Sequence, residues 1–143
     1  MQYKVSDKGI DILKQFEGFR NKAYLDSVGV PTIAWGHTKG VKLGMECDKE
    51  QGEKWLKEDI EPLENYLNTI PELDTQGKFD ACIDFCYNLG IGNFKSSTLL
   101  KKIKNKASDN EICKQFRRWV YAGGKKLAGL VRRREAECEL WIS

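Results

Sequence analysis

The sequence has no long apolar run and no recognisable secretory leader. Its apolar stretches are only a few residues long, whereas a helix needs about 20 apolar residues to cross a bilayer, so we expect no membrane span. The first seven residues show no apolar core and no small-residue cleavage site. The sequence therefore predicts a protein made in the cytoplasm without a signal peptide.

Metal-binding residues are scarce as well. His37 is the single histidine, and the five cysteines form no CxxC pair, so the sequence predicts no metal site. The odd number of cysteines argues against a disulfide framework. Cys82 and Cys86 share one helical face, and we expect both to be small core residues.

Charge is nearly balanced overall, with a formal net charge of +3, but it is unevenly distributed. Residues 101–143 contain 12 Lys and Arg against 5 Asp and Glu, whereas residues 1–100 contain 12 against 16. The C-terminal part is thus expected to attract anions. Anionic cell-wall polymers and nucleic acid both fit this charge, which does not choose between them.

The hydrophobic pattern predicts a small β segment that follows one helix and precedes several others. Residues 6–17 are predicted to form the first helix. Residues 24–46 alternate β-forming residues with turn residues, which predicts an antiparallel hairpin or a three-stranded sheet that turns near residues 27–29. A long amphipathic helix is predicted from residue 48, kinked or split at Pro62.

The remainder of the chain is predicted to be helical. The predicted segments are a buried helix near residues 79–90, a short helix capped by Ser96 and Ser97 that ends near residue 105, a helix opened by the Ser108–Glu111 capping box and stopped at Gly123–Gly124, and a last helix near residues 131–141.

These elements predict a single α+β domain over residues 1–143 that is mostly helical. The expected parts are a small N-terminal β lobe at about residues 20–47, a joining helix at about 48–67 and a larger C-terminal helical lobe at about 76–143. Two such lobes leave room for a cleft between them.

Three polar residues near the β segment carry candidate chemistry. Glu17 ends the first helix beside its apolar stripe, where burial and the helix dipole both disfavour a charged carboxyl. Asp26 follows in a polar turn, and Thr32 lies on the next strand. Glycoside hydrolysis needs a protonated carboxyl and a second group that steers water. On spacing alone, a solvated Glu17 and a turn-forming Asp26 explain the pattern better.

The residues around this trio extend the pattern. Glu17, eight residues, Asp26, five residues and Thr32 are followed by IAWGHT at residues 33–38. Further motifs are YNLG at 87–90, GNFKSSTLL at 92–100, RWVYAGG at 118–124 and GLVRRRE at 129–135. In this order, along essentially the whole chain, the sequence resembles the phage-type lysozymes, or endolysins, of glycoside hydrolase family 24.

The resemblance implies a lysozyme-like fold and hydrolysis of the β-1,4 bond between N-acetylmuramic acid and N-acetylglucosamine in peptidoglycan. Glu17 would be the general acid. Asp26 would position or activate water or stabilise the oxocarbenium-like state, and Thr32 would help to hold the water. Thr38, Tyr87 and Ser97 stand where the family lines its sugar site. No metal or organic cofactor is implied.

The same resemblance implies an endolysin that lyses bacterial cells. Such a protein would act as a monomer on the cell wall after release from the host cytoplasm, would depend on a separate holin for access to the wall and would bind no nucleic acid. Two alternatives stay open. One is a lytic transglycosylase, which does not need Asp26 and Thr32; the other is a non-catalytic module that binds cell wall or nucleic acid.

Several neighbouring residues also carry expectations. His37 is expected to be structural, either holding the β segment or pairing with a carboxylate. The resemblance suggests that one arginine among residues 132–134 approaches Glu17 while the others face solvent. Ala34 stands where the family usually has glycine, and its extra methyl group is expected to narrow the sugar site and to alter substrate handling modestly.

Overall fold

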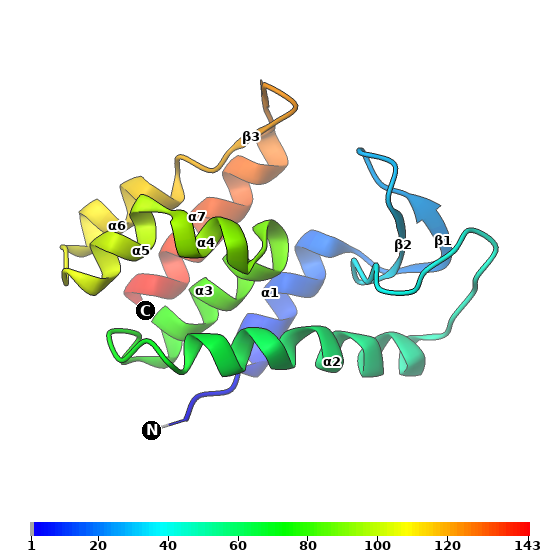
Figure 1. Ribbon diagram of the computed structural model, residues 1–143, viewed down its shortest axis with the longest axis horizontal. Coiled ribbons are helices and arrows are strands. Elements are labelled where there is room, and N and C mark those ends of the chain that lie inside the picture. Colours follow the sequence, from blue (N-terminus) through cyan, green and yellow to red (C-terminus); the bar gives the residue numbers. More distant parts are fainter. Residues whose placement is uncertain (1) are drawn as a thin grey trace. The chain divides into compact units, whose positions relative to one another are not determined.

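A computed structural model describes residues 2–143 of the chain (Figure 1). These residues form seven helices and two small antiparallel sheets. In chain order the elements are α1 (Asp7–Glu17), β1 (Arg20–Leu25), β2 (Pro31–Ala34), α2 (Lys49–Leu67), α3 (Gln76–Leu89), α4 (Ile91–Ser96), α5 (Thr98–Lys104), α6 (Asp109–Phe116), β3 (Tyr121–Ala122), β4 (Lys125–Lys126) and α7 (Ala128–Ile142).

The chain forms two compact units. The hairpin unit comprises Leu13–Pro62, and the helical unit comprises the chain up to Ile12 together with Leu63–Ser143. The boundaries between them fall within α1 and within α2. The division into a β lobe, a joining helix and a helical lobe stays a prediction.

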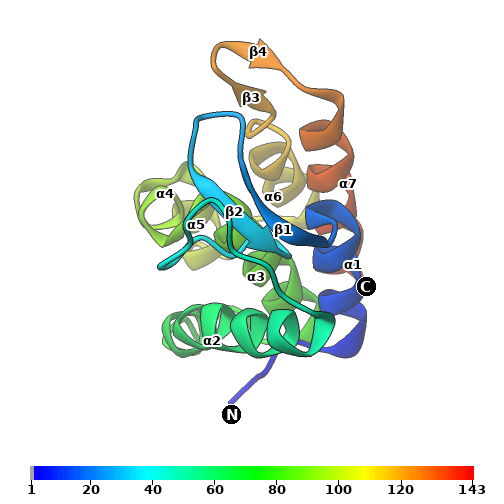
Figure 2. The same cartoon turned by 90° about the vertical axis from the view of Figure 1, so that its right-hand side faces the viewer.

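The β1–β2 hairpin carries the β structure of the hairpin unit (Figure 2). Tyr24 pairs with Thr32, and a shift in register separates this pairing from that of Arg20 with Ala34. The chain turns between the strands over residues 26–30, as the sequence predicts. The sheet has two strands, and an isolated bridge from Lys22 to Glu46 stands where a third strand would pair.

Helix α2 closes the core of the hairpin unit. The rings of Phe19 and Trp35 lie with their centroids 4.8 Å apart, and Gly52 of α2 packs on them so tightly that a Cβ there would lie 2.9 Å from Phe19. The helix runs unbroken through Pro62, so the predicted split is wrong, while the alternative of a kink stays a prediction. Pro62 is exposed, and Ile60 and Leu63 beside it are buried, so the apolar side of the helix continues past the proline.

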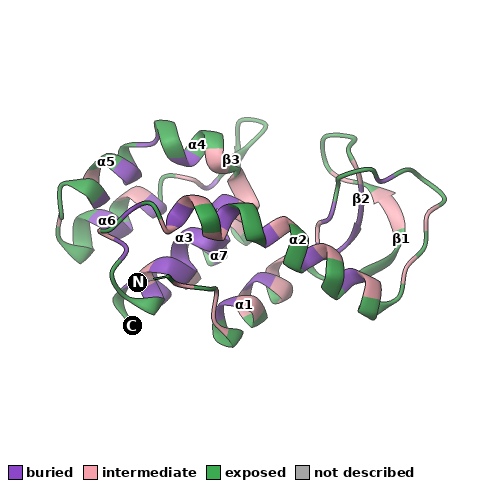
Figure 3. Cartoon of the chain, turned by 60° about the horizontal axis from the view of Figure 1, so that its bottom comes forward, coloured by how far each residue is buried: buried purple, intermediate pink, exposed green. Residues whose placement is uncertain are grey.

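Helix α3 is the centre of the helical unit. Nine of its 14 residues are buried (Figure 3), including Cys82 and Cys86, which confirms their prediction as core residues. Helix α7 packs along α3 (Figure 1). The Phe85 ring meets Phe116 edge-on at 5.8 Å and Trp119 at 5.4 Å. Such aromatic contacts stabilise a core beyond the area that they bury.

The start of α1 belongs to this helical unit and is anchored on α3. The buried Asp80 accepts hydrogen bonds from the Ser6 backbone N–H at 3.0 Å and from Gln76 Nε2 at 2.8 Å, and the Ser6 hydroxyl also bonds to it. Gly9 packs directly against this carboxylate, because a Cβ there would lie 2.9 Å from Asp80 Cγ. The bonds satisfy a carboxylate that burial would otherwise destabilise.

The segment before α7 differs from its prediction. Helix α6 begins at the predicted Ser108 cap, whose hydroxyl accepts from the Glu111 N–H at 3.3 Å, but it ends at Phe116. Gly123 and Gly124 instead form the turn of the β3–β4 hairpin, with φ of 58° and 78°. Two consecutive residues with positive φ suit a two-residue hairpin turn, so this pair turns a hairpin rather than ending a helix.

Candidate active site

Glu17 is the last residue of α1, as predicted, and its side chain is half-buried. Its carboxyl group lies against the backbone of Gly36, in the turn that follows β2. A Cβ atom at position 36 would overlap Glu17 Oε1 and would lie 3.0 Å from Glu17 Cδ. The carboxyl therefore occupies space that any other residue at position 36 would fill.

Asp26 opens the turn between β1 and β2, and backbone groups fix its carboxylate. Oδ1 accepts hydrogen bonds from the Val28 N–H at 2.9 Å and from the Val30 N–H at 2.8 Å. The Asp26 N–H donates to the Val30 carbonyl at 3.0 Å. This Asx-type turn orients the carboxylate through the tip of the hairpin.

Thr32 is only 4% exposed, and its hydroxyl group has a defined role. Oγ1 donates a hydrogen bond to the Val30 carbonyl at 2.8 Å. Because a hydroxyl has one proton and two lone pairs, the Thr32 oxygen remains an acceptor toward any further partner.

Tyr24 is a further residue of this hairpin, and it was not singled out from the sequence. It pairs with Thr32 across the hairpin, and burial raises the pKa of its phenol, an effect that the Arg20 cation opposes and that the charges of Glu17 and Asp26 reinforce. Both carboxylates thus act electrostatically on one phenol in the hairpin unit. The alternation of side chains along a strand offered a signal, since Tyr24 stands two residues before Asp26.

Ala34 is completely buried, and its φ is +55°. Its methyl group faces α2, because a Cβ at Gly52 would lie 3.2 Å from the Ala34 Cβ. The expectation that this methyl group narrows the sugar site is therefore wrong. Glycine would adopt this left-handed backbone without the strain that alanine bears.

His37 has the structural role that the sequence predicts. It is 5% exposed, its ring stacks on Trp55 with the centroids 4.6 Å apart, and its Nδ1 lies 2.7 Å from Asp59 Oδ2. Both partners belong to α2. Its backbone also exchanges two hydrogen bonds with Ile33, each 2.9 Å long, so His37 ties the turn after β2 to that helix.

The three residues predicted to bind sugar lie in different surroundings. Thr38 is exposed in the hairpin unit, and Tyr87 is half-buried on α3 in the helical unit. The Ser97 hydroxyl is buried, donates to the Phe94 carbonyl at 2.6 Å and accepts from the Leu100 N–H at 3.0 Å. It thereby caps α5. Their sugar contacts stay predictions.

The arginines of α7 differ strongly in exposure. Arg132 is exposed, whereas Arg133 and Arg134 are 5% and 0% exposed. The expectation that all but one of them face solvent is therefore wrong. Buried acids explain the difference, since Arg133 pairs with Asp84 at 2.9 Å and Arg134 with Glu137 at 2.7 Å, and a buried charge needs such a partner.

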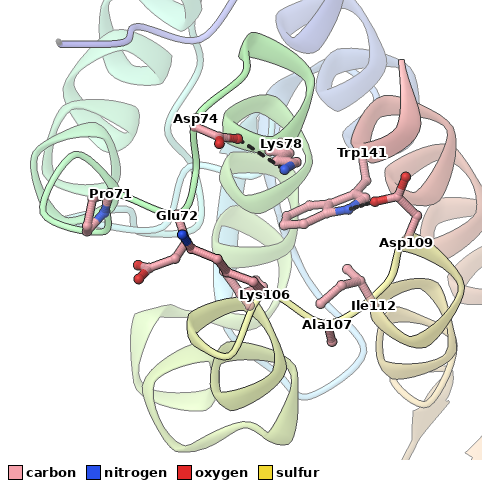
Figure 4. A pocket seen from close by; sticks show the side chains of 10 residues that line it. Pro71, Glu72, Asp74, Lys78, Lys106, Ala107, Asp109, Ile112 and Trp141 are labelled. Carbon is pink, nitrogen blue, oxygen red and sulfur yellow. Dashed lines mark hydrogen bonds and ion pairs between the residues drawn. The ribbon is translucent and has the colours of Figure 1, made fainter.

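A hollow of about 300 Å³ lies elsewhere in the helical unit (Figure 4). Its polar lining groups are largely engaged with one another. Lys78 Nζ lies 3.0 Å from Asp74 Oδ1, and Trp141 Nε1 donates to Asp109 Oδ1 at 3.1 Å. None of the residues predicted to act on substrate lines it, so we assign it no part in the chemistry.

Over residues 2–143, the structure contains no group of three or more His, Cys, Asp or Glu side chains placed to hold a metal ion. In the same part of the chain, no helix combines the length and apolar character that crossing a bilayer requires.

Comparison with known proteins places this geometry in a family. The phage lysozyme family model matches residues 14–137. The chain is 38% identical to an endolysin of Acyrthosiphon pisum secondary endosymbiont phage 1, over 97% of this chain and 98% of that protein. The chain is also 36% identical to an endolysin of Bacillus phage B103 over 97% of this chain, but this chain spans only 54% of the length of that relative.

A solved structure agrees over nearly the whole chain. The muramidase domain of SpmX from Asticaccaulis excentricus superposes with a TM-score of 0.88 at 30% sequence identity and covers 99% of both chains. This match confirms the predicted lysozyme-like α+β fold, which is mostly helical with a small sheet. The chain therefore belongs to the phage lysozyme family, glycosidases that hydrolyse bacterial peptidoglycan.

Proposed function

We propose that this chain is a muramidase that cleaves the β-1,4 bond between N-acetylmuramic acid and N-acetylglucosamine, with Glu17, Asp26 and Thr32 as its reacting and water-holding groups. In this proposal Glu17 is the general acid. Asp26 and Thr32 together hold the attacking water. Thr38, Tyr87 and Ser97 contact the sugar.

The arrangement of acceptors at Asp26 and Thr32 carries the proposal. The Thr32 proton is engaged with the Val30 carbonyl, so its oxygen can only accept a hydrogen bond from a water molecule. The Asp26 carboxylate is also an acceptor, and two backbone N–H groups fix its orientation. A water that donates one proton to each group keeps its lone pairs free for attack on the sugar.

The reaction then balances as a hydrolysis. Glu17 gives its proton to the glycosidic oxygen as the bond from that oxygen to the anomeric carbon breaks. The water oxygen bonds to the anomeric carbon, and Asp26 takes the proton that the water loses. Because the Thr32 hydroxyl donates elsewhere, it positions the water without entering the proton transfer.

The test is mass spectrometry of muropeptides released from purified peptidoglycan by the unmodified protein and by Asp26→Asn. The amide still accepts both backbone hydrogen bonds but cannot take a proton, so we expect kcat to fall by about 10²–10⁴-fold. The unmodified protein should release hydrated products with a reducing muramic acid end. The control is Asp48→Asn, because Asp48 Oδ1 likewise accepts a backbone hydrogen bond, from Gln51 at 2.8 Å, without a proposed part in the reaction.

Three results would contradict the proposal. Products with a 1,6-anhydro end would identify a lytic transglycosylase, which needs no attacking water. Full activity of Asp26→Asn would remove Asp26 from the reaction. Salt-sensitive DNA binding without any cleavage of peptidoglycan would instead indicate a non-catalytic module.

We also propose that the chain acts as a monomer, is made in the host cytoplasm and reaches the wall with the help of a separate holin. The family resemblance supports this route. Expression in a bacterium whose isolated peptidoglycan the protein degrades should leave the culture turbid, and co-expression of a holin should cause a rapid loss of optical density. Lysis without a holin would show that the chain crosses the membrane by another route.

A further inference from the structure

We propose that Gly36 is a positioning residue for Glu17: the absence of a side chain at position 36 creates the space in which the Glu17 carboxyl is held. This inference rests on the proposed role of Glu17 as the acid. Its basis is a contact within the hairpin unit, between the end of α1 and the turn after β2.

The turn that contains Gly36 is held firmly. Ile33 and His37 exchange two backbone hydrogen bonds of 2.9 Å around it. His37 in turn stacks on Trp55 and lies 2.7 Å from Asp59, both on α2. Because these contacts fix the turn, its backbone is poorly able to move aside for an added atom.

The Glu17 carboxyl is the part that can move. It ends a side chain with several rotatable bonds, and a Cβ at position 36 would overlap its Oε1 and approach its Cδ to 3.0 Å. A methyl group at position 36 would therefore displace the carboxyl while the fold persists. A displaced acid no longer meets the glycosidic oxygen at the distance that proton transfer needs.

Gly36 differs in this respect from the other glycines with positive φ. Of the eight such glycines within residues 2–143, Gly36 alone has an atom within 4 Å of its would-be Cβ. Gly40 is the closest match, because its φ is +71° against +74° for Gly36, and nothing lies near its would-be Cβ. Alanine at either position strains the backbone equally, but only at position 36 does it collide with Glu17.

The experiment compares Gly36→Ala with Gly40→Ala in solution, using soluble peptidoglycan strands and the formation of reducing ends. We expect similar decreases in Tm for both variants. Gly36→Ala should lower kcat about 100-fold with little change in KM, whereas Gly40→Ala should keep the kcat of the unmodified protein. The alkaline limb of the pH profile of kcat/KM reports the pKa of the essential acid. This limb should shift only in Gly36→Ala.

Equal kcat values and equal pH profiles for the two folded variants would overturn the inference. Glu17→Gln, measured in the same assay, separates this failure from that of the proposed function. If Glu17→Gln is inactive while Gly36→Ala matches Gly40→Ala, only the positioning role fails. If Glu17→Gln is fully active, the proposed function fails, and the positioning role fails with it.

A second pair of variants applies if Gly36→Ala does not fold. Asparagine carries a Cβ but tolerates positive φ better than alanine does. Gly36→Asn and Gly40→Asn therefore repeat the comparison with less backbone strain. The same difference in kcat is expected, and equal kcat values would again overturn the inference.

Discussion

Replacing Glu17 with glutamine is expected to lower kcat for peptidoglycan hydrolysis by about 10³-fold while the protein stays folded. The amide matches the carboxyl in size, so it fits the space beside Gly36, but it cannot give a proton to the leaving oxygen. General acid catalysis contributes rate factors of about 10²–10⁴. The measurement is the rate of reducing-end formation, with circular dichroism to verify the fold.

Glu46→Gln is the matched control for this loss. Glu46 belongs to the same unit, but its side chain is 68% exposed and lies 3.9 Å from Lys22 in a surface ion pair. Exposed pairs of this kind contribute little to stability, so activity and Tm should both stay near those of the unmodified protein. Comparable activities of Glu17→Gln and Glu46→Gln would refute Glu17 as the acid.

The second large effect is on stability: Arg134→Met should lower the free energy of unfolding by about 3–5 kcal/mol. Arg134 is completely buried, and its guanidinium donates to Asn88 Oδ1 at 2.7 Å and to the Trp119 carbonyl at 3.2 Å. It also lies 2.7 Å from Glu137. Methionine can fill much of the volume, but it leaves these acceptors without their donor.

Arg132→Met provides the comparison, because Arg132 lies two residues earlier on the same helix and is exposed. Surface substitutions away from special features change stability by about 0.5 kcal/mol or less. Urea denaturation of both variants measures the difference. A loss below about 1 kcal/mol for Arg134→Met would mean that the buried network contributes little net stability, as happens when desolvation offsets ion pairing.

Protonation of Glu137 sets the pH dependence of this network. Burial, with the hydrogen bond and the charge of Asp84, raises the pKa of Glu137 well above its usual range, against the opposing charges of Arg134 and Arg133. Burial by itself would raise the pKa of Asp84. Its hydrogen bonds to Glu137 and Arg133, together with the Arg133 charge, outweigh burial, so the pKa of Asp84 is lowered. Glu137 thus holds a proton more tightly in the folded chain than in the unfolded one.

The sign of the pH dependence follows from this difference. A raised carboxyl pKa contributes stability that is fully present below the unfolded value, 4.5 for Glu137, and is lost as pH rises through the folded value. The Glu137→Gln variant has no carboxyl to ionise at this position, so it lacks this loss. Its stability relative to the unmodified protein, measured by urea denaturation at several pH values, should therefore rise as pH increases above about 4.5. A stability difference that does not change with pH would contradict the raised pKa.

The sequence by itself determined several elements, because these elements depend on interactions between residues that are close together in the chain. The Ser108 cap, the end of α1 at Glu17 and the turn after Asp26 all depend on residues within a few positions of one another. A capping side chain or an Asx-type turn acts on its own neighbours, so its signal is complete in a short stretch of sequence. The motif resemblance added the family and the roles proposed for Glu17, Asp26 and Thr32.

Only the tertiary structure decided the features that depend on contacts between distant residues. Arg132, Arg133 and Arg134 cannot be told apart in the sequence, and only the packing of α7 on α3 buries the last two and places Arg133 beside Asp84. Likewise, Gly36 stands 19 positions after Glu17, and no local pattern reveals that its missing side chain makes room for that carboxyl. Burial and close approach are properties of the packed chain, since they arise where segments meet in space.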